Sequence, residues 1–339
     1  PPPMRLSDFL EDSLTRTGGQ IRESTKAEQQ AAMMQFIEVV GDIHTNDVCF
    51  KHGEQLRQVC FDRGNSPATV SKKLRSLKRL FQLGVDRGQL DVNPIRRVAL
   101  PRAPQKKIET FTVDECERLI RAAREATKPD GVQWDLLIGM AMVTGARRAE
   151  LLNAVWSDVD FESLTFNIEP KVDTTETWRW EIKDAERRSL PLTDEIVGRL
   201  SDHQAEQPTG LPYIFVPPAR YEHIQRLRGK GQWSFSDARL KVLNNFNGAW
   251  RRILTAAGIG REIRFHDLRS TALSSWFANG LTEFEIMRLA GHSSFSTTHQ
   301  FYLSVGDGLI DRARAAVGKG LGSNLARTWR APLISEKRA

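Results

Sequence analysis

A group of arginine, histidine and acidic residues between positions 144 and 302 has the types and spacing needed to bind a phosphate. Its first motif is TGARRAE, residues 144–150. Gly145 would end one helix and let the next begin, which places Arg147 in a first turn near free backbone N–H groups. Glu150 lies three residues after Arg147 and shares its helix face, so its carboxylate can hold the guanidinium in position.

The second motif is HDLR, residues 266–269, which places His266 and Arg269 on the same side of a helix. An imidazole and a guanidinium together can bind a phosphate and stabilise charge that develops on it. Taken alone, this motif is a weak signal, because such a pair is more often structural.

The third motif is LAGHSS, residues 289–294, and Tyr302 follows it. We expect Gly291 to close the preceding helix, and the serines and threonines after His292 to cap the helix that carries Tyr302. A histidine after a helix-ending glycine is more often a packing residue when it stands alone. The order and separation of the three motifs are therefore more informative than any one of them.

In combination, the motifs closely resemble the catalytic domain of the tyrosine recombinases, the phage integrase family. That family is marked by T-G-x-R-x-x-E, then H-x-x-R, then L-x-G-H-S-S with a tyrosine shortly after. The resemblance covers residues 112–305 strongly, and residues 5–100 more loosely resemble the family's helical core-binding domain. It implies a site-specific recombinase that cleaves and rejoins DNA through a 3′-phosphotyrosyl intermediate.

The resemblance also implies a role for each matched polar residue. Arg147 and Arg269 match the two arginines that clamp the scissile phosphate. His266 and His292 match the two histidine positions that support the phosphate and proton transfer. Glu150 matches the acidic residue that positions the first arginine.

Two lysines are candidates for the general acid that the resemblance implies. Lys183 follows the apolar run at 178–182 and precedes Arg188 and residues 191–192, which matches the lysine of the family's β-hairpin. In the family this lysine acts as general acid towards the leaving 5′ oxygen. Lys171 is the alternative candidate in this chain.

Tyr302 is the expected nucleophile, although its spacing departs from the family pattern. In most members the tyrosine lies one residue nearer the G-H histidine, at the position where this chain has Phe301. Tyr213 and Tyr221 are the other tyrosines, and both precede the H-x-x-R motif. Tyr302 is thus favoured by elimination as well as by position, while the register of its helix is left open.

The implied chemistry is coherent without a metal or ATP, so no cofactor is expected. A phenol has an unperturbed pKa near ~10, and bound cations and nearby bases must assist its deprotonation. Two arginines and the histidines would neutralise the pentacoordinate transition state, which is the role of Mg²⁺ in many phosphoryl-transfer sites. The phosphotyrosine bond retains the energy of the broken diester, so religation requires no ATP.

The whole-chain composition is that of a soluble globular protein. A length of 339 residues suggests two domains, with 40% hydrophobic and 27% charged residues. No apolar run approaches the ~20 residues that a membrane helix needs. The three cysteines, Cys49, Cys60 and Cys116, form no disulfide framework and fit a reduced, cytoplasmic protein.

Positive charge is concentrated in the first part of the chain. Residues 1–107 hold 18 Lys and Arg against 12 Asp and Glu, and so carry +6 of the total +7. Within it, residues 66–81 predict a helix with Ser66 as N-cap and Pro67 at the first helical position. Its cations fall largely off the apolar stripe and are candidate DNA contacts, the alternative being a solvated face. They are Lys72, Lys73, Arg75, Lys78 and Arg79.

The pattern along the chain predicts a mainly α fold with a small antiparallel β-sheet. We expect a helical core-type DNA-binding domain at 1–104, a linker at 105–111, an α+β catalytic domain at 112–320 and a tail at 321–339. Three apolar alternating runs predict the strands, and a polar interruption looks like an inserted loop. These runs are 164–168, 178–182 and 190–192, and the interruption is 217–237.

The expected partners are double-stranded DNA attachment sites and further copies of the chain. The resemblance implies a tetramer on DNA that exchanges a carboxy-terminal segment between neighbours, with a monomer possible in solution. We expect residues 309–339 to supply that segment, and accessory DNA-bending proteins are further candidate partners. The target sequence, and the phage, conjugative or chromosomal role, are not readable from the chain.

Three other interpretations compete with recombination. A type IB topoisomerase-like enzyme would share the chemistry but relax DNA, and a catalytically silent regulator would use the same scaffold only to bind DNA. The silent regulator needs phosphate contacts but no nucleophile, so the complete set of matched residues argues against it. A zinc site has no common finger spacing and is disfavoured. Its candidate ligands would be His44, Cys49, His52 and Cys60.

Overall fold

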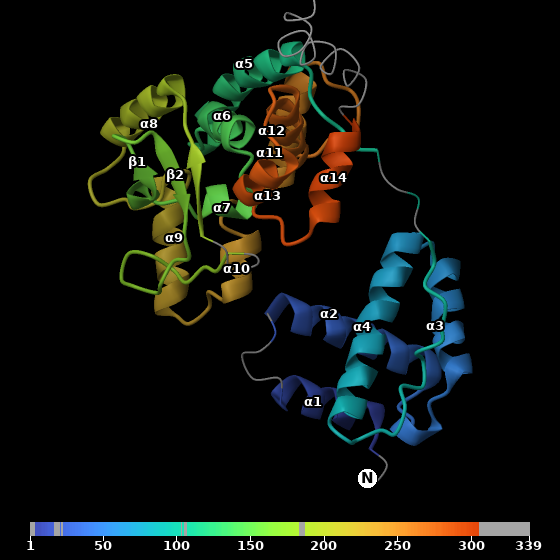
Figure 1. Cartoon of the computed structure of the whole chain (residues 1–339). Coiled ribbons are helices and arrows are strands. Elements are labelled where there is room, and N and C mark those ends of the chain that lie inside the picture. Colours follow the sequence, from blue (N-terminus) through green and yellow to red (C-terminus); the bar gives the residue numbers. More distant parts are fainter. Residues whose placement is uncertain are drawn as a thin grey trace, which may run out of the picture. The chain divides into compact units, whose positions relative to one another are not determined.

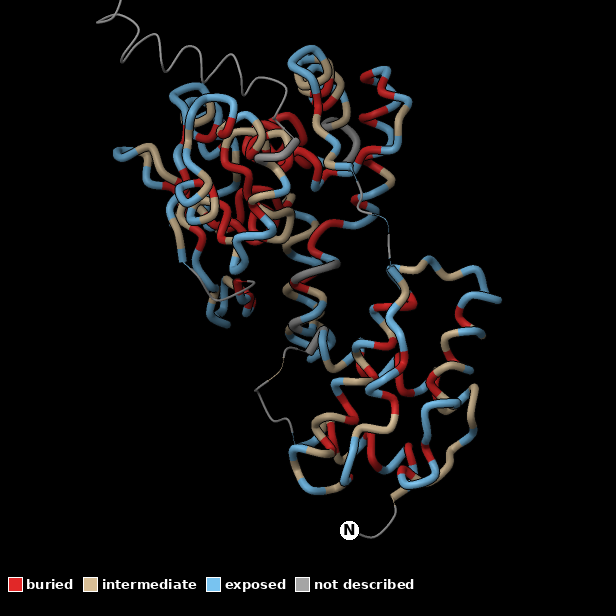
Figure 2. The backbone as a smooth tube through the Cα atoms, turned by 45° about the vertical axis from the view of Figure 1, so that its right-hand side comes forward, coloured by how far each residue is buried: buried red, intermediate tan, exposed pale blue. Residues whose placement is uncertain are grey.

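Two units make up the fold, Pro1–Lys106 and Lys107–Ala339. The computed structural model describes residues 4–16, 21, 23–102, 104, 107–182 and 187–304 of the chain (Figure 1). The expected catalytic lysine, Lys183, and the carboxy-terminal segment 309–339 lie outside these residues. Buried residues run through the middle of each unit, so each unit has a hydrophobic core of its own (Figure 2).

In the described residues of the first unit, every regular element is a helix. Its α-helices enclose one apolar core that includes Phe9, Phe36 and Phe81, and the Phe9 ring stacks on that of Phe81 with centroids 5.7 Å apart. The elements are α1 (Leu6–Arg16), α2 (Glu23–Val40), η1 (Thr45–Asp47), α3 (Phe50–Asp62) and α4 (Pro67–Asp86).

Helix α4 confirms the helix predicted from residue 66 onward and extends it to Asp86. The Ser66 hydroxyl accepts a hydrogen bond from the backbone N–H of Thr69, and Pro67 occupies the first turn, where its missing N–H costs nothing. The predicted apolar stripe is buried against α1, α2 and α3. Its residues are Val70, Leu74, Leu77, Leu80 and Phe81.

The second unit combines a small sheet with a larger group of helices (Figure 1). The sheet is antiparallel with strand order β1-β2-β3. Its strands are β1 (Val159–Asp160), β2 (Thr165–Ile168) and β3 (Arg188–Pro191). The helices are α5 (Val113–Asp130), α6 (Trp134–Thr144), α7 (Arg148–Leu152), η2 (Trp156–Asp158), α8 (Asp194–Glu206), α9 (Pro218–Gly229), α10 (Phe235–Leu240), α11 (Phe246–Ala256), α12 (Asp267–Ala278), α13 (Glu283–Ala290) and α14 (Phe295–Ser304).

The prediction of a strand at 178–182 was wrong, because these residues form no strand of the sheet. Strand β3 pairs directly with β2, so that Phe166 lies opposite Leu190, and the segment makes one isolated bridge, Lys171 to Trp180. The physical reason lies in its tryptophan side chains. The Trp178 ring stacks on Tyr213 at 3.8 Å, and its backbone N–H donates to the Tyr213 hydroxyl. The alternating apolar residues therefore anchor a loop in the core.

The expectation of a loop at 217–237 was also wrong, because this segment contains helix α9 and the beginning of helix α10. Helix α9 begins after Pro217 and buries Ile224. Its Arg228 guanidinium donates to the backbone carbonyl of Thr177 at 2.9 Å and pairs with Asp173 at 2.9 Å. A helix held by long-range polar contacts has little apolar periodicity, so its sequence resembles a loop.

Candidate active site

The first part of the site is the turn between α6 and α7. Gly145 ends α6 in the left-handed conformation with φ 59°, and Arg147 is the N-cap residue of α7. A Cβ at Gly145 would lie 3.0 Å from Leu273 and 3.2 Å from Trp276, both on α12. Glycine therefore allows both the turn and the close approach of α12. The predicted helix break is confirmed.

Glu150 holds Arg147 at this turn. Its carboxylate accepts hydrogen bonds from the Arg147 backbone N–H at 2.7 Å and from Arg147 Nη1 at 3.0 Å. The side chain is only 1% exposed. Burial alone would raise the pKa of Glu150, but the charges of Arg188 and Arg147 more than offset that effect and lower it. Glu150 is thus held as a carboxylate that positions cations.

Arg188 joins Arg147 and Arg269 in what we call the arginine cluster, and the motifs did not assign it. At the start of β3, it donates from Nη2 to Glu150 at 2.7 Å and from Nε to the Leu289 carbonyl at 2.8 Å, with 5% of its side chain exposed. The signal for it was strand alternation, since 188 shares the side of the strand that buries Leu190 and Leu192. A cation on a buried strand face needs a partner in the interior.

Arg269 forms the centre of the site. Its Nη1 donates to the Gly145 carbonyl at 2.7 Å, and its Nη2 donates to the Ala290 carbonyl at 2.6 Å and to His292 Nε2 at 2.8 Å. Burial and the nearby charge of Arg147 lower its pKa to about 9, so the guanidinium stays cationic at neutral pH. A buried cation whose neighbours are also cations favours a bound anion.

The end of α13 joins the two arginines. Arg147 Nη2 donates to the Gly291 carbonyl at 2.6 Å, next to the Ala290 carbonyl that Arg269 contacts. As predicted, Gly291 ends α13 in the left-handed conformation with φ 61°, and the capping box of Thr282 and Glu285 begins that helix. The structure therefore brings the T-G-x-R, H-x-x-R and G-H motifs together around one set of backbone carbonyls.

His292 lies between Arg269 and α14. Its Nδ1 is 2.9 Å from the hydroxyl of Thr298 on α14, and its Nε2 faces Arg269. Burial and the positive charges of Arg269, Arg147 and Arg188 lower the pKa of His292 to about 3. The imidazole is therefore neutral at physiological pH.

His266 immediately precedes α12 at an exposed edge of the same cluster. The protein atoms around its imidazole desolvate it, and Arg269 adds positive charge, so its pKa is also lowered. Within the described part of the chain, no hydrogen bond of this imidazole to another residue is found. His266 thus presents a neutral, exposed ring beside the buried arginines.

Helix α14 carries Tyr302 and packs on α12 and α13. Phe301 packs against the small apolar core of these helices, and its ring stacks on His292 with centroids 6.1 Å apart and an interplanar angle of 17°. Phe301 and Thr298 therefore meet the same imidazole from one side of α14. Phe301 is also the residue found where most family members have their tyrosine.

Tyr302 is the next residue of α14. The side chain of Tyr302 itself is outside what the structure describes.

The alternative lysine, Lys171, is engaged elsewhere. Its ammonium pairs with Asp158 at 2.7 Å and donates to the Glu169 carbonyl at 2.8 Å. The Lys171 side chain is 8% exposed and that of Asp158 is 7% exposed, so this is a buried ion pair. Removing the lysine for proton transfer would leave Asp158 buried without its partner. Lys171 is therefore a structural lysine.

The candidate DNA contacts on α4 divide into two kinds. Lys78 is half-buried and donates to the carbonyls of Arg96 at 2.9 Å and Val98 at 2.5 Å, and burial lowers its pKa. Lys72 is exposed and pairs with Glu28 at 2.7 Å across a weak surface bridge. Lys78 thus stabilises the segment after α4 through these two hydrogen bonds, whereas most of the candidate cations face solvent. Arg75 and Arg79 are exposed, and Lys73 is half-buried and donates to Asn65 Oδ1 at 2.8 Å.

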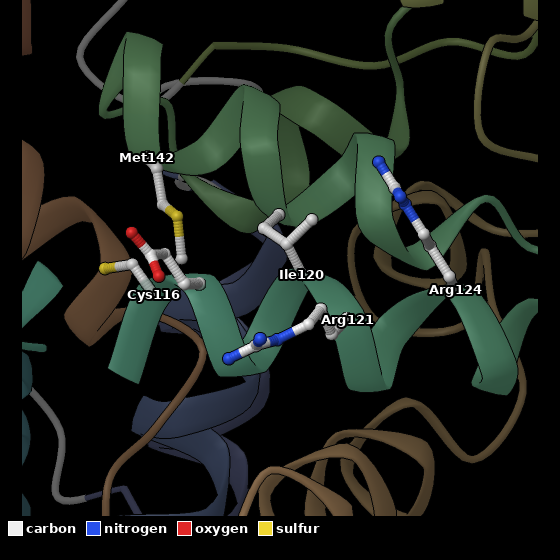
Figure 3. Close-up of a pocket in the computed structure, with 6 residues that line it drawn as sticks. Cys116, Ile120, Arg121, Arg124 and Met142 are labelled. Carbon is white, nitrogen blue, oxygen red and sulfur yellow. The ribbon is translucent and has the colours of Figure 1, made fainter. Parts of the chain in front are cut away.

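A hollow of about 440 Å³ lies away from these residues, on α5 and α6. Figure 3 shows Cys116, Ile120, Arg121 and Arg124 along α5, with Met142 above them on α6. Burial raises the pKa of the Cys116 thiol to about 11. No residue of the arginine cluster lines this hollow.

Two further expectations concern sites that the described residues do not contain. No group of three or more His, Cys, Asp or Glu residues that could hold a metal ion occurs among them, and the disfavoured zinc candidates include Cys60, which is buried in the first core. Within the same ranges, no helix combines the length and the apolar character that crossing a membrane requires.

Comparison with known families and proteins gives one consistent result. The model of the phage integrase family matches residues 109–307. A tyrosine recombinase XerC-like protein of Caldanaerobacter subterraneus subsp. tengcongensis is 26% identical over 264 residues, which is 72% of this chain and 64% of that protein. An integrase of Saccharopolyspora erythraea is 24% identical over 294 residues, 73% of this chain and 65% of that protein. The chain belongs to the phage integrase family, the tyrosine recombinases.

Solved structures share the fold at low sequence identity. The Tn1549 transposon integrase in complex with a circular intermediate DNA has a TM-score of 0.68 at 15% identity, covering 91% of this chain and 99% of that one. A lambda integrase dimer bound to a core site has a TM-score of 0.64 at 17% identity, covering 88% of this chain and 77% of that one.

The chain covers less than two thirds of the length of the two curated relatives named above.

Proposed function

We propose that the protein is a site-specific DNA recombinase that cleaves and rejoins DNA through a 3′-phosphotyrosyl intermediate, with Tyr302 as nucleophile. The observation that carries the proposal is the junction of Arg147, Arg269 and His292 at the end of α13, beside the helix of Tyr302. Such a group of preorganised donors stabilises the charge of a phosphate under attack.

The two guanidiniums bind the scissile phosphate. Arg269 gives three of its N–H donors to acceptors among the described residues, and a guanidinium has five, so two are left for phosphate oxygens. Glu150, which also accepts a hydrogen bond from Arg188, holds Arg147 in place from the protein side. His266 supplies a further ring nitrogen at the exposed edge of the cluster.

Strand cleavage follows as an exchange of one phosphate ester for another. The Tyr302 oxygen forms a bond to phosphorus, the bond from phosphorus to the 5′ oxygen breaks, and the phenolic proton passes to a base of the site. Lys183 donates a proton to the leaving 5′ oxygen. Attack by a different 5′ hydroxyl reverses these steps. The engagement of Lys171 with Asp158 supports Lys183 as the acid.

Double-stranded DNA as substrate is supported from two directions. The integrase structures of similar fold are complexes with DNA, one of them a lambda integrase tetramer on a Holliday junction. Residues 1–107 carry most of the net positive charge, and neutralising phosphates releases counterions. We propose that the exposed cations of α4 contact the DNA backbone and that the chain assembles as a tetramer on paired sites.

The test is covalent trapping on nicked DNA in EDTA. A pool of nicked duplexes with a randomised core is incubated with the full chain, and adducts that resist denaturing gel electrophoresis are isolated and sequenced. We expect the wild type to form an adduct and Tyr302→Phe to form none, because the substitution removes one oxygen and keeps the ring volume. Tyr213→Phe is the matched control and should retain the adduct, since that hydroxyl is buried against Trp178.

The second candidate function is a catalytically silent DNA-binding regulator. It is favoured by Phe301, whose ring stacks on His292 at the position where most family members have their tyrosine. This function would give sequence-specific binding with no adduct from the wild type. An adduct that persists in Tyr302→Phe would instead overturn Tyr302 as the nucleophile.

A further inference from the structure

Thr298 is the buried polar residue among those of α14 whose side chains the structure describes. The residue is fully buried, with 0% exposed, and its hydroxyl lies 2.9 Å from Nδ1 of His292. Burying a hydroxyl is unfavourable unless it is hydrogen-bonded, so this contact is the reason that a polar side chain is tolerated there. It links the tyrosine helix directly to the arginine cluster.

The partners of His292 determine where its proton is. Arginine has only N–H donors, so the contact of Arg269 Nη2 with His292 Nε2 at 2.8 Å requires Nε2 to be the acceptor. In the neutral imidazole the proton is then on Nδ1, which donates it to the Thr298 hydroxyl. Thr298 therefore accepts the proton that fixes the tautomer.

We propose that Thr298 is a positioning residue for strand cleavage, which fixes the ring of His292 and ties the helix of Tyr302 to Arg269. The proposal rests on the recombinase function proposed above. It assigns to Thr298 the task that a hydrogen-bonded partner commonly has for a histidine, which is to set the tautomer and the ring orientation. With Nδ1 protonated, the basic nitrogen Nε2 faces the phosphate-binding arginine.

Phe301 completes the restraint on the ring. It lies three residues after Thr298 and stacks on the face of the His292 imidazole, whereas Thr298 and Arg269 hold the two nitrogens. The ring is thereby fixed in rotation and tilt. Any shift of α14 along its axis would break the Thr298 contact, so the position of residue 302 relative to Arg269 depends on it.

The adjacent Thr297 provides a matched control. It has the same side chain, lies on the same helix and is exposed. The variants are Thr298→Val, which removes the hydroxyl and keeps the shape, Thr298→Ser, which keeps the hydroxyl, and Thr297→Val. The rate of adduct formation is measured with the full chain on the trapped nicked duplex, alongside its affinity for the same DNA.

We expect Thr298→Val to slow adduct formation about tenfold, because Nδ1–H is left buried without an acceptor. Affinity for the DNA should stay within about twofold, as an interaction used in the transition state affects the rate selectively. Thr298→Ser should restore most of the rate, and Thr297→Val should match the wild type. A Thr298→Val rate equal to the wild-type rate overturns the proposal, as does an equal loss in Thr297→Val.

Nitrogen NMR of the histidine rings gives a readout that packing alone would not change. With ¹⁵N-labelled histidine, and His292 assigned from a His292→Asn variant, the wild type should show a protonated Nδ1 and an unprotonated Nε2 at neutral pH. Thr298→Val should lose this fixed signature while Thr297→Val keeps it. A wild-type ring protonated on Nε2 overturns the proposal without any Thr298 variant.

Failure of the recombinase function is distinguishable from failure of this inference. If the wild type forms no adduct, cleavage is refuted and the positioning role of Thr298 in cleavage is refuted with it. If the wild type forms the adduct and Thr298→Val does so equally fast, only the role of Thr298 is refuted.

Discussion

Two sets of cations, those of the arginine cluster and those of α4, differ in how the protein holds them. Arg188 and Arg269 are buried and give their N–H groups to Glu150 and to backbone carbonyls. Arg75 and Arg79 are exposed on the solvent side of α4. A buried cation has a fixed direction, which suits a single phosphate in a reaction. An exposed cation without a fixed direction suits a long and uniform polyanion.

We expect the arginine cluster and the cations of α4 to differ most in how much they contribute to the free energy of unfolding. Glu150→Ala would leave Arg147 and Arg188 without their shared anion, and breaking a buried ion pair costs about 3–5 kcal/mol. Chemical denaturation of the purified chain measures this loss. Glu162→Ala removes an exposed carboxylate and should stay within about 0.5 kcal/mol of the wild type. Similar destabilisation in both variants would mean that the cluster is not specially anchored.

The pH dependence of stability should sharpen the contrast, because His292 is buried among the arginines. Its pKa is about 3 in the folded chain and about 6.5 when unfolded. Between these values only the unfolded state binds the proton, so the free energy of unfolding should fall as pH drops below about 6.5. Denaturation curves across this range should show a shallower fall for His292→Asn. An unchanged fall would place the imidazole in a more hydrated environment.

The smallest effect on the fold is expected from α4. Replacing the exposed cations Lys72, Arg75 and Arg79 by alanine should leave stability almost unchanged but flatten the salt dependence of DNA binding. On a log–log plot the slope should decrease by about 0.9 for each phosphate that the variant no longer neutralises. Lys78→Met is the matched control. Its ammonium is bonded to two carbonyls, so the slope should stay as in the wild type. Binding to duplex DNA in a salt titration distinguishes these outcomes.

Local features of both regions were predictable from the sequence. The caps at Ser66 and Thr282 and the turns at Gly145 and Gly291 depend on residues a few positions apart, and the structure has them where the sequence places them. Three motifs also converged on one site because their order is that of a known family. Short-range physics and a specific resemblance were sufficient for these features.

Long-range polar contacts were not predictable in the same way. Arg188 binds Glu150 and Leu289, which are 38 and 101 residues away, so its role becomes visible only in three dimensions. The segment at 178–182 has the alternation of a strand, but Trp178 stacks on Tyr213 instead. Tertiary packing overrides local preference in such cases. The roles of Lys183 and Tyr302 remain proposals.

The backbone acceptors of the arginine cluster have a consequence for how the site can vary. Arg147 and Arg269 bind the carbonyls of Gly145, Ala290 and Gly291, which every amino acid possesses. A point substitution cannot delete these acceptors; it can only displace them by changing the chain path. The two glycines adopt positive φ, so that path is most sensitive there. The three acceptors therefore stay in place as long as the two turns keep their shape.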